Sequence, residues 1–213
     1  TEENTLSLHD ALPIWAALVA GRAVCLMRDF DAAKALATIS KRRVTHWSAL
    51  PESFEQMREL GADAVRKADT SSLRELEIGG APASADLKGW LASLFAPILS
   101  EAYGSTEAGR ISTMPLARLH EKPGSCGRPI RGVSVEIRDE HGQRLPAGAI
   151  GEIWARTPRS LVCDLPASPT RKTLRDVDGY VATGDNGRID EDGFIYITGK
   201  ATGLPEPEMR HFG

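Results

Sequence analysis

Short apolar runs alternate with longer amphipathic segments through the first half of the chain, and this alternation limits the possible folds more than any other feature. The apolar runs have the length and residue types of buried strands, and they lie at 23–27, 44–47, 73–78 and 98–102. The amphipathic segments have helical spacing, and they lie at 31–43, 51–60 and 84–95. Strands that alternate with helices of this length require right-handed crossovers, so the pattern predicts a mostly parallel sheet with flanking helices.

Residues suited to helix ends support this assignment. Asp31 can cap the first long helix, in which Ala32, Leu36 and Ile39 share one face. Pro51 suits the first turn of the next helix, because its missing amide hydrogen would have no helical partner there. The same segments therefore carry both the periodicity and the boundaries of helices.

The character of the chain changes after about residue 122, where helical periodicity ends and glycines and prolines recur at short intervals. Short β-type runs separate them, at 133–138, 150–155, 180–183 and 194–198. His141-Gly142 and Asp192-Gly193 stand where hairpin turns are expected. This half of the chain therefore predicts a small antiparallel β subdomain.

Together these patterns define an α/β fold with two subdomains, at 15–122 and 123–200. Residues 1–14 show no period and are interpreted as an irregular or foreign segment. Residues 201–213 are rich in Pro and Glu and are expected to be a disordered tail. We interpret the basic segment 159–178 as a surface loop.

Composition is that of an ordinary globular protein, with 41% hydrophobic and 26% charged residues. A formal net charge of −3 gives no electrostatic reason to expect nucleic acid or an anionic membrane as a partner. The three cysteines, Cys25, Cys126 and Cys163, form no metal-binding spacing and favour reduced thiols in a cytoplasmic protein. No apolar run approaches the roughly 20 residues that span a bilayer, and the first residues do not resemble a signal peptide.

The stretch Tyr103-Gly104-Ser105-Thr106-Glu107 follows the last parallel strand and is expected to form a tight polar turn. Ligands bind at the carboxyl edge of such sheets. The tyrosine ring can stack on a base, the glycine and hydroxyls can approach an anion, and the carboxylate is a ligand that Mg²⁺ accepts beside phosphates. A strand-end turn with a solvated Glu107 fits the same residues equally well.

Two further stretches offer related chemistry. Asp185 follows Thr183-Gly184 at the end of a short apolar segment, where a carboxylate can accept both hydroxyls of a ribose. Gly79-Gly80-Ala81-Pro82 follows a strand, and its glycines leave room for a flat ring against bare backbone. Each turn is also common loop chemistry when taken alone.

In this order and spacing, these stretches resemble the adenylate-forming (AMP-binding) superfamily, which includes acyl- and aryl-CoA ligases, luciferases and peptide-synthetase adenylation domains. The resemblance runs from about Gly21 to Lys200, and its most specific markers lie at 103–107, 124–137, 151–158 and 180–200. It implies a distorted barrel for the β subdomain. It also implies an ATP-dependent ligase that binds Mg²⁺, activates a fatty or aromatic carboxylic acid as an acyl-adenylate, and transfers the acyl group to CoA.

The resemblance also implies roles for individual residues. Tyr103 would stack on the adenine, Gly79, Gly80 and Ala81 would contact the purine, and Asp185 would bind the ribose hydroxyls. Gly104 and Ser105 would complete the nucleotide site. Thr106 would contact the α-phosphate, and Glu107 would bind Mg²⁺.

The chain also departs from the superfamily pattern. It lacks the phosphate-binding loop that ends in Pro-Lys-Gly, and the residues after Gly199-Lys200 do not match. We therefore expect a truncated ligase that keeps the adenosine half of the site, is inactive alone, and self-associates through exposed sheet edges. A fragment of a peptide-synthetase adenylation domain and a non-catalytic nucleotide-binding fragment remain alternatives.

Overall fold

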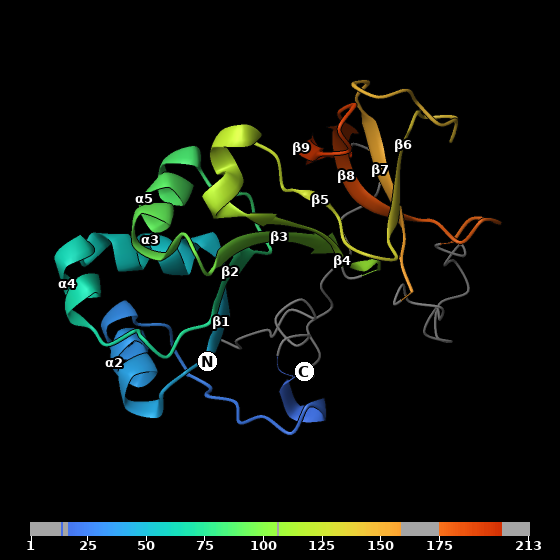
Figure 1. Ribbon diagram of the computed structural model, residues 1–213. Coiled ribbons are helices and arrows are strands. Elements are labelled where there is room, and N and C mark those ends of the chain that lie inside the picture. Colours follow the sequence, from blue (N-terminus) through green and yellow to red (C-terminus); the bar gives the residue numbers. More distant parts are fainter. Residues whose placement is uncertain (1–13, 15–16, 106, 159–174, 202–213) are drawn as a thin grey trace.

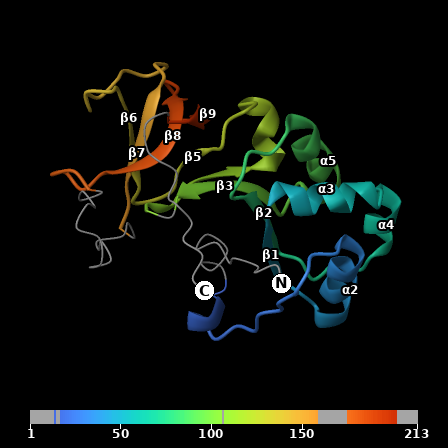
Figure 2. The same ribbon diagram turned by 180° about the vertical axis from the view of Figure 1, so that it is seen from behind.

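The computed structural model describes residues 14, 17–105, 107–158 and 175–201. Its helices are α2 (Ala32–Arg42), α3 (Pro51–Glu59), α4 (Ala62–Lys67), α5 (Ala85–Phe95) and the 3₁₀-helix η1 (Leu116–Glu121). The first sheet contains β1 (His46–Ala49), β2 (Glu75–Gly79), β3 (Leu99–Ser105), β4 (Gly109–Pro115) and β5 (Arg128–Pro129). The second contains β6 (Ser134–Arg138), β7 (Gly151–Arg156), β8 (Val181–Ile189) and β9 (Ile195–Lys200). In both views, α2–α5 gather at one end of the molecule and the second sheet lies at the other (Figures 1 and 2).

The predicted fold class is confirmed, and the first sheet is mixed. Strands β1, β2 and β3 pair in parallel, whereas β3–β4 and β4–β5 pair antiparallel. Only residues 106–108 connect β3 to β4, and a parallel crossover needs a dozen residues or more. The second sheet is antiparallel throughout, in the order β6–β7–β8–β9.

The helix starts agree with the sequence. Asp31 caps α2 by accepting a hydrogen bond from the amide of Lys34 at 2.8 Å, and Ala32, Leu36 and Ile39 are buried together. Pro51 occupies the first turn of α3.

The prediction of a strand at 23–27 is wrong. Residues 22–27 have no regular secondary structure, and Leu26 is 75% exposed. An apolar run becomes a buried strand only where neighbouring strands and a covering layer are available, and the run itself does not specify those partners.

Two expected turns lie inside strands. Tyr103, Gly104 and Ser105 belong to β3, which extends past the predicted strand end. Asp185 lies in the middle of β8, which runs from Val181 to Ile189. The pairing of β3 with β4, and of β8 with β9, supplies the backbone hydrogen bonds that keep both strands extended.

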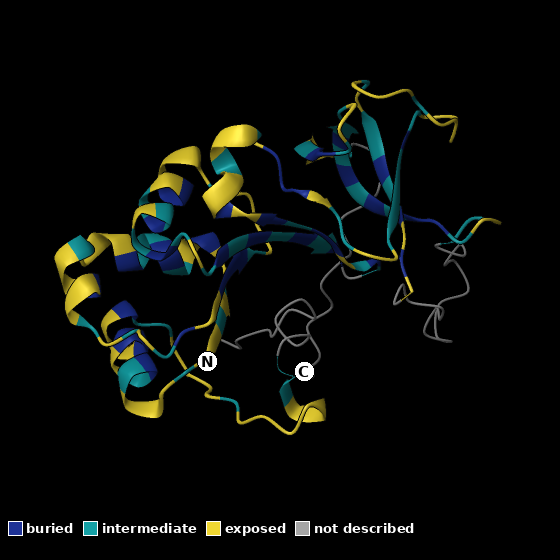
Figure 3. Ribbon diagram, in the orientation of Figure 1, coloured by how far each residue is buried: buried dark blue, intermediate teal, exposed yellow. Residues whose placement is uncertain are grey.

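Two groups of buried side chains hold the fold together (Figure 3). The first lies between the helices and the first sheet and includes the fully buried Phe54, Met57 and Leu76. The second joins the two sheets, and its members include Tyr103, Ala108, Ile111, Ile137, Ile153, Val181 and Ile195. Burial of side chains from both sheets in one cluster fixes β3 and β4 against β7 and β8.

No helix within the described ranges combines the length and the apolar character needed to cross a bilayer. The tail at 202–213, most of the segment at 1–14, and residues 159–174 of the expected loop lie outside the described residues.

Candidate functional site

The carboxyl ends of β1, β2 and β3 lie at one edge of the first sheet, because these three strands are parallel. Gly79 at the end of β2 is paired with Ala102 of β3. The next residue, Gly80, has a φ of +79°, and a Cβ there would lie 2.8 Å from the Leu50 side chain at the end of β1. The positive φ is what favours glycine at position 80, because the neighbouring atom belongs to the end of a flexible side chain that can shift. Ala81 follows and is exposed.

Glycine is also required at position 104. The register of β3 and β4 shifts between Tyr103 and Gly104, which marks a bulge. A Cβ on Gly104 would collide with the carbonyl oxygen of Gly109. The bulge and the close approach of the two strands redirect the chain just before residue 106, which itself lies outside the described residues.

The hydroxyl of Ser105 is used within the hairpin. It accepts a hydrogen bond from the amide of Ala108 at 3.1 Å, and Ser105 is buried. Thr157, which follows β7, donates its hydroxyl to the carbonyl oxygen of Ala108 at 2.7 Å. Glu107 is half-buried in the same short connection.

Tyr103 and Asp185 are 82 residues apart in the sequence and in direct contact in the structure. The tyrosine hydroxyl lies 3.0 Å from Asp185 Oδ2 and 3.1 Å from Thr183 Oγ1. Thr183 donates its own hydrogen to the carbonyl oxygen of Ile153 at 2.9 Å. Burial, followed by the negative charge of Asp185, raises the pKa of Tyr103 far above its usual value, so the phenol remains a neutral donor.

Alternation along β8 explains why Asp185 is buried. Val181, Thr183, Asp185 and Gly187 point to the buried face of the second sheet, and the residues between them are half-buried. This places the carboxylate on the face that packs against Tyr103. A one-residue shift of the strand would turn Asp185 to the other face.

Lys200, the last residue of β9, is paired directly with Asp185. Its Nζ lies 2.7 Å from Asp185 Oδ1. Sequence reasoning assigned no contact to Lys200 and none to Thr183. The pairing of Ile189 with Ile195 beside the hairpin turn would place Gly199 opposite Asp185, and a register shift between Asn186 and Gly187 brings Lys200 there instead. The turn alone therefore does not predict this contact.

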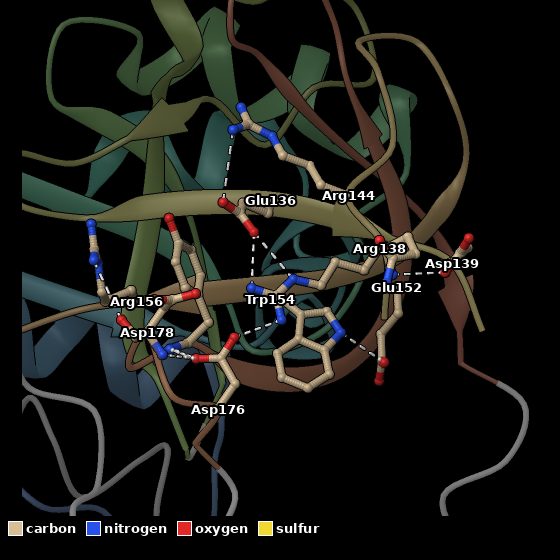
Figure 4. Close-up of polar contacts among 11 residues, drawn as sticks. Glu136, Arg138, Asp139, Arg144, Glu152, Trp154, Arg156, Asp176 and Asp178 are labelled. Carbon is tan, nitrogen blue, oxygen red and sulfur yellow. Dashed lines mark hydrogen bonds and ion pairs between the residues drawn. The ribbon is translucent and has the colours of Figure 1, made fainter. Parts of the chain in front are cut away.

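A polar cluster anchors the start of β8 (Figure 4). Arg138 of β6 lies against the rings of Trp154 and Tyr180, with its guanidinium carbon 4.6 Å and 5.0 Å from their centres. It forms ion pairs with Asp176 at 2.6 Å and with Glu136 at 2.9 Å. Asp176 Oδ1 in turn accepts the amide hydrogens of residues 178 and 180, at 2.9 Å and 2.8 Å. The cluster thus fixes the turn from which β8 leads to Asp185.

The described residues contain no group of three or more His, Cys, Asp or Glu side chains that could hold a metal ion. Glu107 is therefore not part of such a group. Such a residue suits Mg²⁺, which commonly takes one or two protein carboxylates and completes its octahedron with phosphate oxygens and water.

A family model described as "AMP-binding enzyme" matches residues 9–162, well over half of the chain, and the chain belongs to this family. It is 36% identical over 180 residues to 4-coumarate–CoA ligase 1 of Glycine max, covering 82% of this chain and 61% of that protein. It is 37% identical over 176 residues to the putative acyl–CoA ligase YdaB of Bacillus subtilis, covering 81% of this chain and 34% of that protein. The chain thus spans between a third and two thirds of the length of these relatives.

Solved structures with the same fold include the amide bond synthetase McbA from Marinactinospora thermotolerans. That structure has a TM-score of 0.77 and 33% identity, with 86% of this chain and 37% of McbA covered. The ATP-bound structure of MatB from Rhodopseudomonas palustris has a TM-score of 0.75 and 28% identity, with 91% of this chain and 38% of MatB covered.

Proposed function

We propose that this chain is part of an AMP-forming acid–thiol ligase and that it carries the adenosine half of the ligase site. The enzyme would be an acyl- or aryl-CoA ligase that joins a carboxylic acid to CoA through an acyl-adenylate. The observation that carries the proposal is the contact between Tyr103 and Asp185, at 3.0 Å, between two sheets. Family membership supports the reaction class, and the names of the relatives support CoA as the acceptor.

Each residue has a role in this proposal. In this proposal the Asp185 carboxylate accepts the two ribose hydroxyls and is oriented by the Tyr103 hydroxyl, and the adenine is placed beside Tyr103. Gly79, Gly80 and Ala81 supply the strand end, where residues 80 and 81 are exposed and a purine can approach the backbone. Gly104 and Ser105 shape the turn that follows.

The remaining residues act near the phosphates. We assign Thr106 to the α-phosphate and Glu107 to Mg²⁺. ATP, when bound, supplies the phosphoanhydride bond that activates the acid. The chain contributes position and charge rather than a nucleophile, which is the general pattern in phosphoryl and nucleotidyl transfer.

Calorimetric titration with a stable acyl-adenylate mimic tests the half-site. Asp185→Asn keeps the side-chain size and removes the charge, and we expect it to weaken binding about tenfold to a hundredfold, the loss expected for hydrogen bonds to a charged acceptor. Asp29→Asn is the matched control, because Asp29 is exposed in the segment before α2. Equal affinities for both variants and the parent chain would refute the role of Asp185.

A thioester-formation assay on this chain alone tests the second part of the proposal. With ATP, Mg²⁺, CoA and a panel of fatty and aromatic acids, we expect no acyl-CoA, because these 213 residues contain no phosphate-binding loop that ends in Pro-Lys-Gly. Formation of acyl-CoA above background would contradict the assignment of only a half-site.

A further inference from the structure

An apolar groove lies between α5 and η1 and has a volume of about 460 Å³. The residues that line it carry mostly aliphatic side chains: Ala92, Ala96, Leu116, Ala117, Leu119 and Pro123. Among the described residues, His120 is the only one in this lining with a polar side chain. A volume of this size accepts more than one aliphatic side chain, so the α5–η1 groove offers a docking place for an apolar segment.

The same chain carries an exposed apolar segment, residues 18–27, on the other side of the molecule. Its Leu18, Val19 and Leu26 are each more than half exposed. This segment lies in the lower part of both views, whereas α5 and the 3₁₀-helix that follows β4 lie at the top (Figures 1 and 2). One copy of the chain therefore does not place this segment in its own groove, and a second copy can supply it.

Charge disfavours a contact between two such segments. Beside Met27, a second cavity of about 530 Å³ is lined by one acidic residue, Asp29, and by four basic residues, Arg28, Lys34, Lys41 and Arg42. A two-fold contact through the segment would bring the cations of both copies together, and like charges across an interface cost free energy.

The α5–η1 groove does not present this repulsion. No lysine or arginine is among the described residues that line it. The arginine of η1, Arg118, is paired with Glu121 at 2.6 Å. The groove can therefore receive a segment that is flanked by cations.

We propose that the α5–η1 groove is an interaction surface for a second copy of this chain, whose segment 18–27 inserts into it. The contact is head-to-tail, because the two surfaces differ and lie on opposite sides of the molecule. Every dimer then keeps one open groove and one exposed segment, so association continues to larger species unless the rotation closes a ring. The proposal is independent of the adenosine half-site, none of whose residues line the groove.

Sedimentation velocity on the full chain tests the groove. Ala117→Arg places a cation at an exposed position of the lining, and we expect association to weaken about tenfold or more, because an unpaired charge would have to leave water. Ala147→Arg is the matched control, since Ala147 is an exposed alanine between β6 and β7, and it should keep the parent's distribution. An Ala117→Arg variant with the parent's melting temperature and the parent's distribution would overturn the proposal.

A mixing experiment distinguishes head-to-tail from two-fold association. Ala117→Arg keeps an intact segment, Val19→Ser/Leu26→Ser keeps an intact groove, and each is expected to be monomeric alone. Mixed in equal amounts, they should form a dimer and nothing larger, because one complementary pair of surfaces remains. A mixture that stays monomeric would overturn the proposal, and so would a parent chain that is monomeric at every concentration.

Discussion

At the scale of single residues, Tyr103 has a ring and a hydroxyl that can serve different purposes, and the sequence predicted a role only for the ring. The sequence predicted a ring free to stack on a base. In the structure Tyr103 is only 7% exposed, and its hydroxyl is directed at Asp185 and Thr183. Its contribution to a ligand site therefore includes the orientation of a carboxylate as well as any contact through the ring.

Tyr103→Phe separates these tasks, because it removes the hydroxyl and keeps the ring. We expect the free energy of unfolding to fall by about 1–2 kcal/mol, since Asp185 loses a buried donor. Chemical denaturation measures this change. The affinity of Tyr103→Phe for the acyl-adenylate mimic should fall less than that of Asp185→Asn. A larger loss in Tyr103→Phe would contradict the proposal that Asp185 itself binds the ligand.

Lys88 and Glu101 form a buried ion pair, at 2.7 Å, with side chains 8% and 10% exposed. We expect Lys88→Met to destabilise the fold by about 3–5 kcal/mol, because it leaves Glu101 as an unpaired buried charge, and we expect the double variant Lys88→Met/Glu101→Leu to recover most of this loss. Burial raises the pKa of Glu101, an effect that Lys88 only partly offsets.

The pH dependence of Lys88→Met follows from that direction. A carboxyl whose pKa is raised by folding stabilises the fold below its unfolded value, 4.5, and loses this contribution as the pH rises through the folded value. Denaturation curves of Lys88→Met should therefore show stability falling as the pH increases above 4.5. The double variant, which lacks the carboxyl, should show no such fall.

At the scale of elements, the position of Asp185 depends on how β8 begins. Arg138 ties Asp176 to β6, and the Asp176 carboxylate accepts the amide hydrogens of Asp178 and Tyr180, just before β8 begins. The contact between Arg138 and Asp176 does not follow from local sequence, because the two residues are 38 positions apart.

Asp176→Asn tests this anchor. Partial burial opposes the charged form of Asp176, but the amide of Tyr180 and the guanidinium of Arg138 outweigh it and lower the pKa below 3.8. This carboxylate therefore stabilises the fold above that pH, and the contribution is lost as the pH falls through the lowered value. We expect Asp176→Asn to be less stable at pH 7 by about 1–2 kcal/mol. Between pH 5 and 3, the free energy of unfolding of the variant should also fall less than that of the parent. An equal fall in the two proteins would contradict the stabilising role of Asp176.

At the scale of the whole molecule, the described residues leave an apolar segment uncovered. Leu18, Val19 and Leu26 are 55%, 81% and 75% exposed, and Met27 is 37% exposed. These side chains lie in the short segment before α2, which has no strand pairing. Clustered exposed apolar side chains favour contact with another surface.

We predict that the chain self-associates through this segment. Sedimentation velocity over a range of concentrations should show species larger than a monomer. Val19→Ser/Leu26→Ser should shift the distribution toward the monomer, and Leu60→Ser, which changes an exposed leucine elsewhere, should not. An unchanged distribution in the double variant would place the association surface elsewhere.

The sequence by itself determined the elements whose pattern is local. Alternating apolar runs and amphipathic helical segments specify β1–β3 with α2, α3 and α5, and the backbone conformation at position 80 favours glycine. Motif order along the chain was sufficient to indicate the family. Tertiary structure alone decided the antiparallel return of β4, the exposure of residues 23–27, and the union of Tyr103, Asp185 and Lys200. These outcomes depend on which strands pair with each other, and that pairing is determined by packing between segments that are distant in the sequence.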